Sequence, residues 1–179
     1  MATGSGARPA SFDLAPMSPL IAGLTVLLFL LPVVFTVAAF AWAAPLAIPA
    51  GILVALYTWV WLRFRPSRFV VGADGVSIVW PLKRARIPLS DIASARVLDR
   101  PELKAEIGWG LRVGAGGLWG GFGRLQTGNR GSLHLFVSRL DRFVWIECRD
   151  DRPWLITPER PEDFIGALTA AITEGKGGD

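Results

Sequence analysis

The stretch from Leu14 to Leu62 contains no Asp, Glu, Lys or Arg and is rich in Leu, Val, Ile, Ala and Phe. A helix needs about 20 apolar residues to cross the hydrocarbon layer of a membrane, which is about 30 Å thick. The stretch is therefore long enough to cross twice. Pro45 and Pro49 lie near its middle, where a break between two helices is expected. The sequence predicts a membrane anchor over residues 18–64, with spans at about 19–41 and 46–62.

The charges that flank this stretch predict its orientation. Arg63, Arg65 and Arg68 follow the second span, whereas the connection between the spans carries no charge. Positively charged flanks stay on the cytoplasmic side of a membrane. Because a hairpin that leaves on that side also starts there, we expect both termini in the cytoplasm. Residues 1–17, which are mostly Gly, Ala, Ser and Pro, are expected to form a disordered cytoplasmic lead-in.

An alternative interpretation of the first span is a cleaved signal peptide. Ala41-Trp42-Ala43 has the small-x-small pattern of a signal-peptidase site. Cleavage there would leave one span and reverse the topology. The apolar run before it is longer than the core of a signal peptide, about 7–15 residues, and the N-terminus is barely basic. The sequence therefore favours two spans.

Residues 66–174 are predicted to form one domain of ordinary size, followed by a flexible tail at 175–179. Residues 66–179 contain 16 Lys and Arg and 14 Asp and Glu, so no excess of positive charge indicates nucleic-acid binding. The single cysteine, Cys148, excludes an intramolecular disulfide and suits a reducing compartment. This composition agrees with a cytoplasmic domain.

Short β-branched and aromatic runs, separated by turn signals, predict that this domain is mainly β. Asp74-Gly75 lies between two such runs and indicates a β-hairpin. About seven strands are expected in all. A helix then begins near Pro161, and Phe164 and Leu168 lie on its apolar face. These elements predict a bent sheet or small barrel whose open end is covered by the C-terminal helix.

A glycine-rich block from Gly114 to Gly123 interrupts the strand pattern. Neither a Gly-x-Gly-x-x-Gly motif nor a Walker motif fits its spacing, so the sequence does not favour a nucleotide loop. Glycines also let a strand bend sharply or let two backbones approach closely, and the aromatic residues between them can fill space. We therefore expect a structural role, packing between the sheet and the membrane side, for Gly116, Gly117, Trp119, Gly120, Phe122 and Gly123.

The sequence contains no pattern of catalytic or metal-binding residues. His134 is the only histidine, and no second His or Cys stands at a zinc-ligand spacing from it. Its neighbours Leu133 and Leu135 point to the opposite face of the predicted strand, so His134 is expected at the surface. Cys148 is expected to be a small core residue. We expect no enzymatic activity and no cofactor.

Three motifs together resemble the bacterial pleckstrin-homology-like (PH-like) domains. They are the opening Arg68-Phe69-x-Val71-x-x-x-Gly75-Val76 with the later Ile87–Ile92, the block Gly116–Gly123, and the ending Ile156–Phe164, which contains Pro158, Pro161 and Phe164. The resemblance covers Arg68 to about Ile172. It implies a PH-like fold and a location at the bacterial cytoplasmic (inner) membrane, often behind a pair of spans. It implies no catalytic activity.

Two classes of function follow from these predictions. In the first, the domain is a module for protein interaction or assembly at the inner membrane, and its partners are the bilayer and an unidentified protein or a second copy of the chain. In the second, it binds anionic lipid headgroups, to which each nearby cation contributes about 1 kcal/mol. A role as an enzyme subunit is the remaining alternative. The candidate lipid contacts are Arg63, Arg65, Arg68, Lys83, Arg84 and Arg86.

Overall fold

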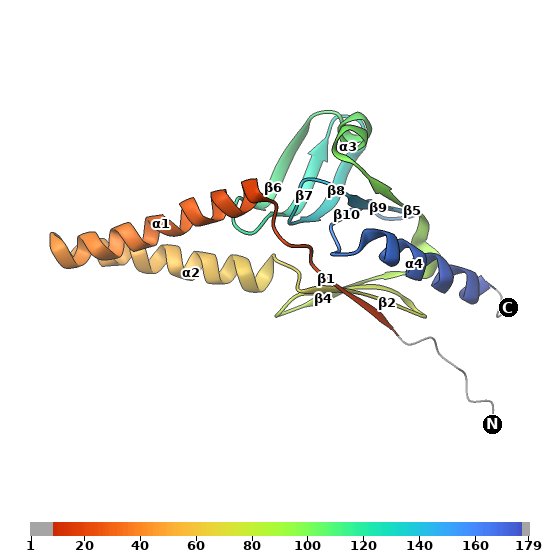
Figure 1. Cartoon of the computed structure of the whole chain (residues 1–179), viewed down its shortest axis with the longest axis horizontal. Coiled ribbons are helices and arrows are strands. Elements are labelled where there is room, and N and C mark those ends of the chain that lie inside the picture. The colour runs from red at the N-terminus through yellow and green to blue at the C-terminus, as the bar shows by residue number, and fades with distance from the viewer. Residues whose placement is uncertain (1–8, 177–179) are drawn as a thin grey trace, which may run out of the picture.

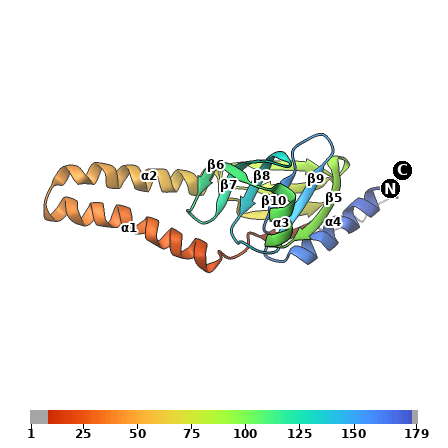
Figure 2. The ribbon, with the colours of Figure 1, turned by 90° about the horizontal axis from the view of Figure 1, so that it is seen from above.

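The computed structural model describes residues 9–176 and has two parts, a helical hairpin and a β domain (Figure 1). Helix α1 spans Pro19–Ala41 and α2 spans Ala47–Arg63, and the 3-10 turn Ala44–Leu46 joins them. Two helical stretches are long and apolar enough to cross a membrane: α1, and Ala44–Arg63, which comprises the 3-10 turn and α2. Their bounds agree with the predicted spans. They lie close together at the connection and diverge towards the domain (Figure 2).

The first sheet has four antiparallel strands in the order β1-β2-β3-β4, and the predicted Asp74-Gly75 hairpin joins β2 to β3. β1 precedes α1 in the chain, whereas its partner β2 follows α2. The helical hairpin is therefore inserted between two neighbouring strands of one sheet. The strands are β1 (Ala10–Asp13), β2 (Arg68–Gly72), β3 (Gly75–Val79) and β4 (Arg84–Pro88).

The prediction of a disordered lead-in over residues 1–17 is wrong for Ala10–Asp13, which form β1. The side chain of Phe12 is buried in this strand and packs edge-on against Phe164, at 5.4 Å between ring centroids. Burial of one aromatic side chain and pairing with β2 are what order this short segment. Residues 1–8 lie outside the described residues.

The second sheet has six strands in the order β5-β9-β10-β8-β7-β6. All neighbours are antiparallel except β10 and β8, which are parallel. β5 and β6 are its two edges. The strands are β5 (Ile92–Leu98), β6 (Gly110–Gly116), β7 (Gly121–Thr127), β8 (Gly131–Val137), β9 (Phe143–Cys148) and β10 (Trp154–Ile156).

Helix α4 (Pro161–Lys176) packs against strands of both sheets and completes the main core. Phe164 and Leu168 are fully buried on its inner face, as their spacing predicts. The predicted fold, mainly β with a C-terminal covering helix, is confirmed, although the strands form two sheets and exceed the seven expected. The flexible tail predicted at 175–179 is wrong for residues 175 and 176, which continue α4, and residues 177–179 lie outside the described residues.

A second helix of the domain, α3 (Arg100–Ile107), is absent from the predicted elements. Asp99 and Glu102 form a capping box at its start, which is a recognisable sequence signal. Near its end, Glu106 accepts hydrogen bonds from Arg96 of β5 and from Arg130 in the β7–β8 turn. These bonds, chiefly the one from Arg130, lower the pKa of Glu106. The two ion pairs of Glu106 connect the end of α3 to β5 and to the β7–β8 turn.

Candidate functional site

The turn between β6 and β7 rests on the helical hairpin and forms the main junction between the two parts. The Gly117 N–H donates to Gly120 O at 3.1 Å and closes the turn. The hydroxyl oxygen of Thr25, on α1, accepts a hydrogen bond from the Trp119 N–H at 3.0 Å. It also lies 2.8 Å from Ile21 O and 3.2 Å from Gly117 O, so its proton has an acceptor on either side. The buried Thr25 side chain of the hairpin thus provides a hydrogen-bond acceptor for a backbone N–H of the domain.

The Trp119 side chain lies between the two helices and is 9% exposed. Its ring meets Trp61 of α2 edge-on at 4.8 Å and Phe29 of α1 at 5.7 Å between centroids. Phe29 in turn packs on Tyr57, whose hydroxyl donates to Leu28 O at 3.0 Å. Edge-to-face aromatic pairs of this kind are favourable beyond the area they bury. A residue of the domain therefore helps to set the separation of the helices.

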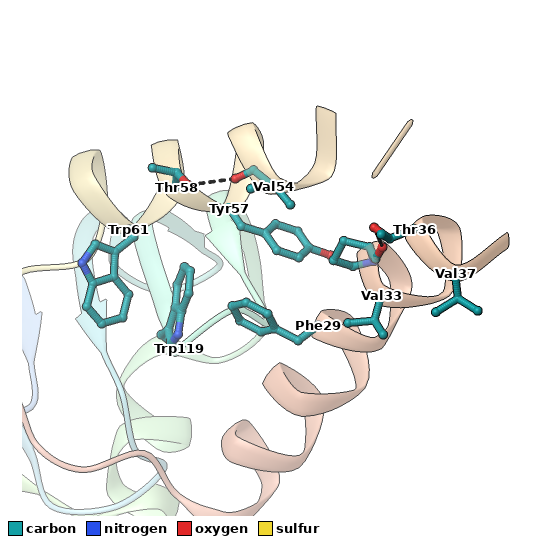
Figure 3. Close-up of a pocket in the computed structure, with 10 residues that line it drawn as sticks. Phe29, Val33, Thr36, Val37, Val54, Tyr57, Thr58, Trp61 and Trp119 are labelled. Atoms are coloured by element: carbon teal, nitrogen blue, oxygen red, sulfur yellow. Dashed lines mark hydrogen bonds between the residues drawn. The ribbon is translucent and has the colours of Figure 1, made fainter. Parts of the chain in front are cut away.

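A groove of about 520 Å³ opens beside this aromatic cluster, between α1 and α2 (Figure 3). Trp61 and Trp119 form its end nearest the domain, and Tyr57 and Phe29, whose rings pack together, line it between the helices. A second hollow of about 570 Å³, lined mainly by Ala and Gly, continues from it along the hairpin, and the two share Thr36 and Val54. The first groove is lined by Phe29, Pro32, Val33, Thr36, Val37, Val54, Tyr57, Thr58, Trp61 and Trp119.

Two glycines of the turn have backbone geometry that other residues rarely adopt. Gly120 has φ +148°, and a Cβ there would lie 2.1 Å from Val137 O. Gly117 has φ +96°, and a Cβ there would press against the side chains of Leu24 and Leu28 on α1 at 3.2–3.4 Å. The turn can approach both β8 and α1 because these positions have no side chain.

A family model described as a bacterial PH domain matches residues 67–172. The chain belongs to the bacterial PH domain family. No curated protein and no solved structure matches the chain. The matched residues of the PH domain run from β2 into α4 and leave out β1, α1 and α2. Of the junction residues, Trp119 lies inside the match, whereas Thr25, Tyr57 and Trp61 lie outside it.

The two ends of the hairpin are also fixed to the PH domain by hydrogen bonds. Before α1, the Ser138 hydroxyl donates to Ala15 O at 2.6 Å, and the Ala15 N–H donates to Thr157 O at 2.9 Å. After α2, the buried Trp80 donates its indole N–H to Phe64 O at 2.9 Å. Both helix ends are therefore held to the same domain.

Two of the predicted lipid contacts lie over aromatic rings at the end of α2. The guanidinium of Arg65 lies 4.3 Å from the centre of the Trp61 ring, and burial lowers its pKa. The ammonium of Lys83 lies 4.4 Å from the centre of the Trp80 ring; burial, and to a lesser degree the charge of Arg63, lowers its pKa. These cations are already in favourable cation–π contacts within the chain.

The other four predicted contacts differ in whether they are paired with an acidic residue of the chain. Arg86 of β4 makes a salt bridge of 2.6 Å to Asp74, which lies in the β2–β3 turn. Within residues 9–176, Arg63, Arg68 and Arg84 make no salt bridge, and all three are exposed. The structure thus places free positive charge near the end of α2 and at the start of β2 and β4.

The edge strand β6 carries a row of exposed apolar side chains. Leu111 and Val113 occupy alternate positions of the strand and are 62% and 63% exposed. Trp109, just before the strand, is 71% exposed. β6 pairs with β7 on one side, and across the described residues no strand pairs with its other side. Alternation places these three residues on one face. Sequence analysis did not single out this edge, although the alternation of Trp, Leu and Val with Gly and Arg is visible there.

His134 and Cys148, the single histidine and the single cysteine of the sequence, lie on different strands, β8 and β9. The His134 side chain is 19% exposed, and its ring stacks on the Trp154 ring at 4.1 Å between centroids. His134 lies on the strand face opposite the buried Leu133 and Leu135, as expected, but it is largely covered and not at the open surface, because Trp154 of β10 is its partner in the parallel pairing. Burial lowers the pKa of His134. Cys148 is buried as expected, and burial raises the pKa of its thiol to about 11, so it stays protonated and unreactive.

Proposed function

We propose that this protein is a non-enzymatic PH module, anchored in the cytoplasmic (inner) membrane by α1 and α2 and presented to the cytoplasm. The pairing of β1 with β2 supports this arrangement. Because β1 precedes α1 and β2 follows α2, both ends of the hairpin lie on the same side of any membrane that it enters. Arg63, Arg65 and Arg68, which follow α2, favour the cytoplasm for that side.

The role of the module is protein interaction, and the observation that carries this proposal is the free edge of β6. The strand offers unpaired backbone N–H and C=O groups together with the exposed Leu111 and Val113. An extended segment of a partner can add to such an edge, with the backbone providing affinity and the side chains providing specificity. Proteins usually blunt exposed edges because they promote association. An edge left open and apolar therefore favours a binding surface.

Burial in the membrane is a poor explanation for the exposed face of β6. In hydrocarbon, each unpaired backbone group costs several kcal/mol, so open sheet edges do not occur there. The helices α1 and α2 satisfy their own backbone groups, whereas the outer edge of β6 does not. A partner strand satisfies both the backbone and the apolar side chains of β6.

Photo-crosslinking in native membranes tests the interaction. A photoreactive amino acid at Leu111 is expected to give a discrete adduct of higher mass, because the partner covers this edge. The matched control is the same substitution at Thr169, which is exposed on α4 away from β6. An adduct with the mass of two chains identifies a second copy as the partner. The absence of an adduct at Leu111, or the same products from both positions, contradicts the proposal.

A second candidate function is contact with anionic lipid headgroups through the β3–β4 turn. Leu82 is 61% exposed at this turn and is followed by Lys83 and Arg84, and the bond from Trp80 to Phe64 places the turn beside the end of α2. A spin label at Leu82→Cys tests this contact with the full chain in nanodiscs. Deeper immersion in phosphatidylglycerol than in phosphatidylcholine supports it, whereas equal immersion in both lipids eliminates it.

A further inference from the structure

The groove between α1 and α2 lies on the same helix face as an arginine. Val54, Trp61 and Arg65 follow one another on α2 and its end at steps of seven and four residues, which keeps them on one side of the helix. Arg65 comes one turn after Trp61 on the side of the PH domain. Its guanidinium rests on the Trp61 ring, which forms the end of the groove. A cation therefore lies against the Trp61 ring at the domain end of an apolar groove.

Arg65 has capacity for a further partner. Its Nε atom is buried and makes no hydrogen bond within the described residues. Arg63, two residues earlier in the chain and exposed at the end of α2, carries a second positive charge. Burial of an unpaired cation is unfavourable, and an anion that accepts the Arg65 N–H bonds would relieve that cost.

The occupant of the groove has to be apolar along most of its length and anionic at the end near the domain. A helix from a second copy meets the first condition but not the second, because Leu14 to Leu62 contain no acidic residue to pair with Arg65. A phospholipid meets both. Tryptophans also favour the level of the headgroups, where Trp61 and Trp119 would then lie.

We propose that this groove binds one acyl chain of an anionic phospholipid, with the lipid phosphate on Arg65. The acyl chain lies against Phe29, Val33 and Tyr57, and its part nearest the headgroup contacts Trp119. Because Trp119 belongs to the β6–β7 turn, the bound lipid touches the PH domain as well as its anchor. This site is separate from the exposed basic residues of the β3–β4 turn, and it rests on the proposed insertion of the hairpin in the membrane.

Quenching of tryptophan fluorescence by lipids brominated on the acyl chain tests the site with the full chain in nanodiscs. Brominated phosphatidylglycerol, diluted into phosphatidylcholine, is expected to quench a saturable part of the emission. Its apparent affinity should exceed that of brominated phosphatidylcholine about fivefold, as one cation near an anionic headgroup implies. Arg65→Gln should remove this preference, and Val33→Phe should fill the groove and abolish the saturable quenching by both lipids.

Two variants serve as matched controls. Val34→Phe adds the same volume next to the groove but outside its lining, and Arg100→Gln removes an exposed arginine at the start of α3 that is not among the candidate lipid contacts. Both should behave as wild type. Equal quenching by the two lipids, or a preference that survives Arg65→Gln, overturns the lipid site while leaving the anchor in place. No quenching by either lipid overturns the membrane anchor and the site together.

Discussion

The helical hairpin and the PH domain use the same apolar residue types and bury them in opposite ways. Phe40 of α1 is 89% exposed, whereas Phe164 of α4 is 0% exposed. In water, a contiguous exposed apolar surface as large as that of the hairpin would drive aggregation. The difference is what the proposed insertion of the hairpin in a membrane predicts, because the domain buries its apolar residues in its own interior and most of the apolar side chains of the hairpin remain exposed.

The edge strand β6 is the exception within the domain. Leu111 and Val113 are exposed to an extent similar to the residues of the hairpin, for example Val37 at 61%. The two surfaces nevertheless differ in their backbone, because helices satisfy their own N–H and C=O groups and an edge strand does not. For the same side-chain exposure we therefore propose lipid in one region and a protein partner in the other.

The largest expected difference between the regions comes from one substitution made in each. Phe164→Ala removes a fully buried ring from between the sheets and α4, and should lower the free energy of unfolding by about 3–5 kcal/mol. Phe40→Ala removes an exposed ring and should change it by less than about 1 kcal/mol. Denaturant unfolding of both variants in detergent measures the comparison. A Phe164→Ala variant as stable as Phe40→Ala would mean that α4 is peripheral.

A smaller contrast is expected at glycines. Gly120→Val places a side chain against Val137 O in a conformation that favours glycine, and should destabilise the fold by on the order of 3 kcal/mol. Gly51→Val, on α2, meets nothing within 4 Å and should be tolerated. The amount of folded protein in the membrane is the readout. Equal accumulation of the two variants would show that the turn does not require glycine.

Substitutions at two threonines of α1 compare the junction with the rest of the hairpin. Thr25→Val leaves the buried Trp119 N–H without its acceptor and should cost about 2 kcal/mol. Thr36→Val removes a hydroxyl that bonds only to Pro32 O of its own helix and should be nearly neutral. Thermal unfolding followed by tryptophan fluorescence compares them. Matching melting temperatures would show that the turn is not anchored through Thr25.

The smallest expected effect is a pH dependence confined to the domain. The pKa of His134 is lowered from its ordinary value of 6.5 by burial, so the unfolded chain binds a proton more readily than the folded one. Stability should therefore fall as the pH decreases from about 7 to about 5. His134→Gln should flatten this slope, and since His134 is the only histidine, no other imidazole obscures the result. An unchanged slope would assign the effect to carboxylates.

The helices and most strands could be predicted because their signals are local. The uncharged stretch, the Asp74-Gly75 turn and the apolar face of α4 each lie within a short run of sequence. β1 could not be predicted, because Ala10–Asp13 is short and its partner β2 follows the whole hairpin. α3 also has a local signal, because the capping box formed by Asp99 and Glu102 marks the start of a helix.

The junction was only partly predictable for the same reason. The glycine block indicated a tight turn packed with aromatic residues, and Trp119 lies in that turn. Its acceptor Thr25 is 94 positions earlier in the chain, and nothing in the local sequence distinguishes it from Thr36. The burial of His134 was missed because it depends on stacking with Trp154 from a parallel neighbouring strand.

Cysteine accessibility tests the central contrast between the regions most directly. Cys148 is buried, with a thiol pKa of about 11, so a cysteine introduced at Ala43 or Thr169 would provide the reactive thiol. With a membrane-impermeant maleimide, Ala43→Cys, between the helices, should react in intact cells. Thr169→Cys, exposed on α4, should react only after the cells are permeabilised. Labelling of Thr169→Cys in intact cells, or protection of Ala43→Cys there, would contradict a hairpin that spans the membrane and a PH domain that faces the cytoplasm.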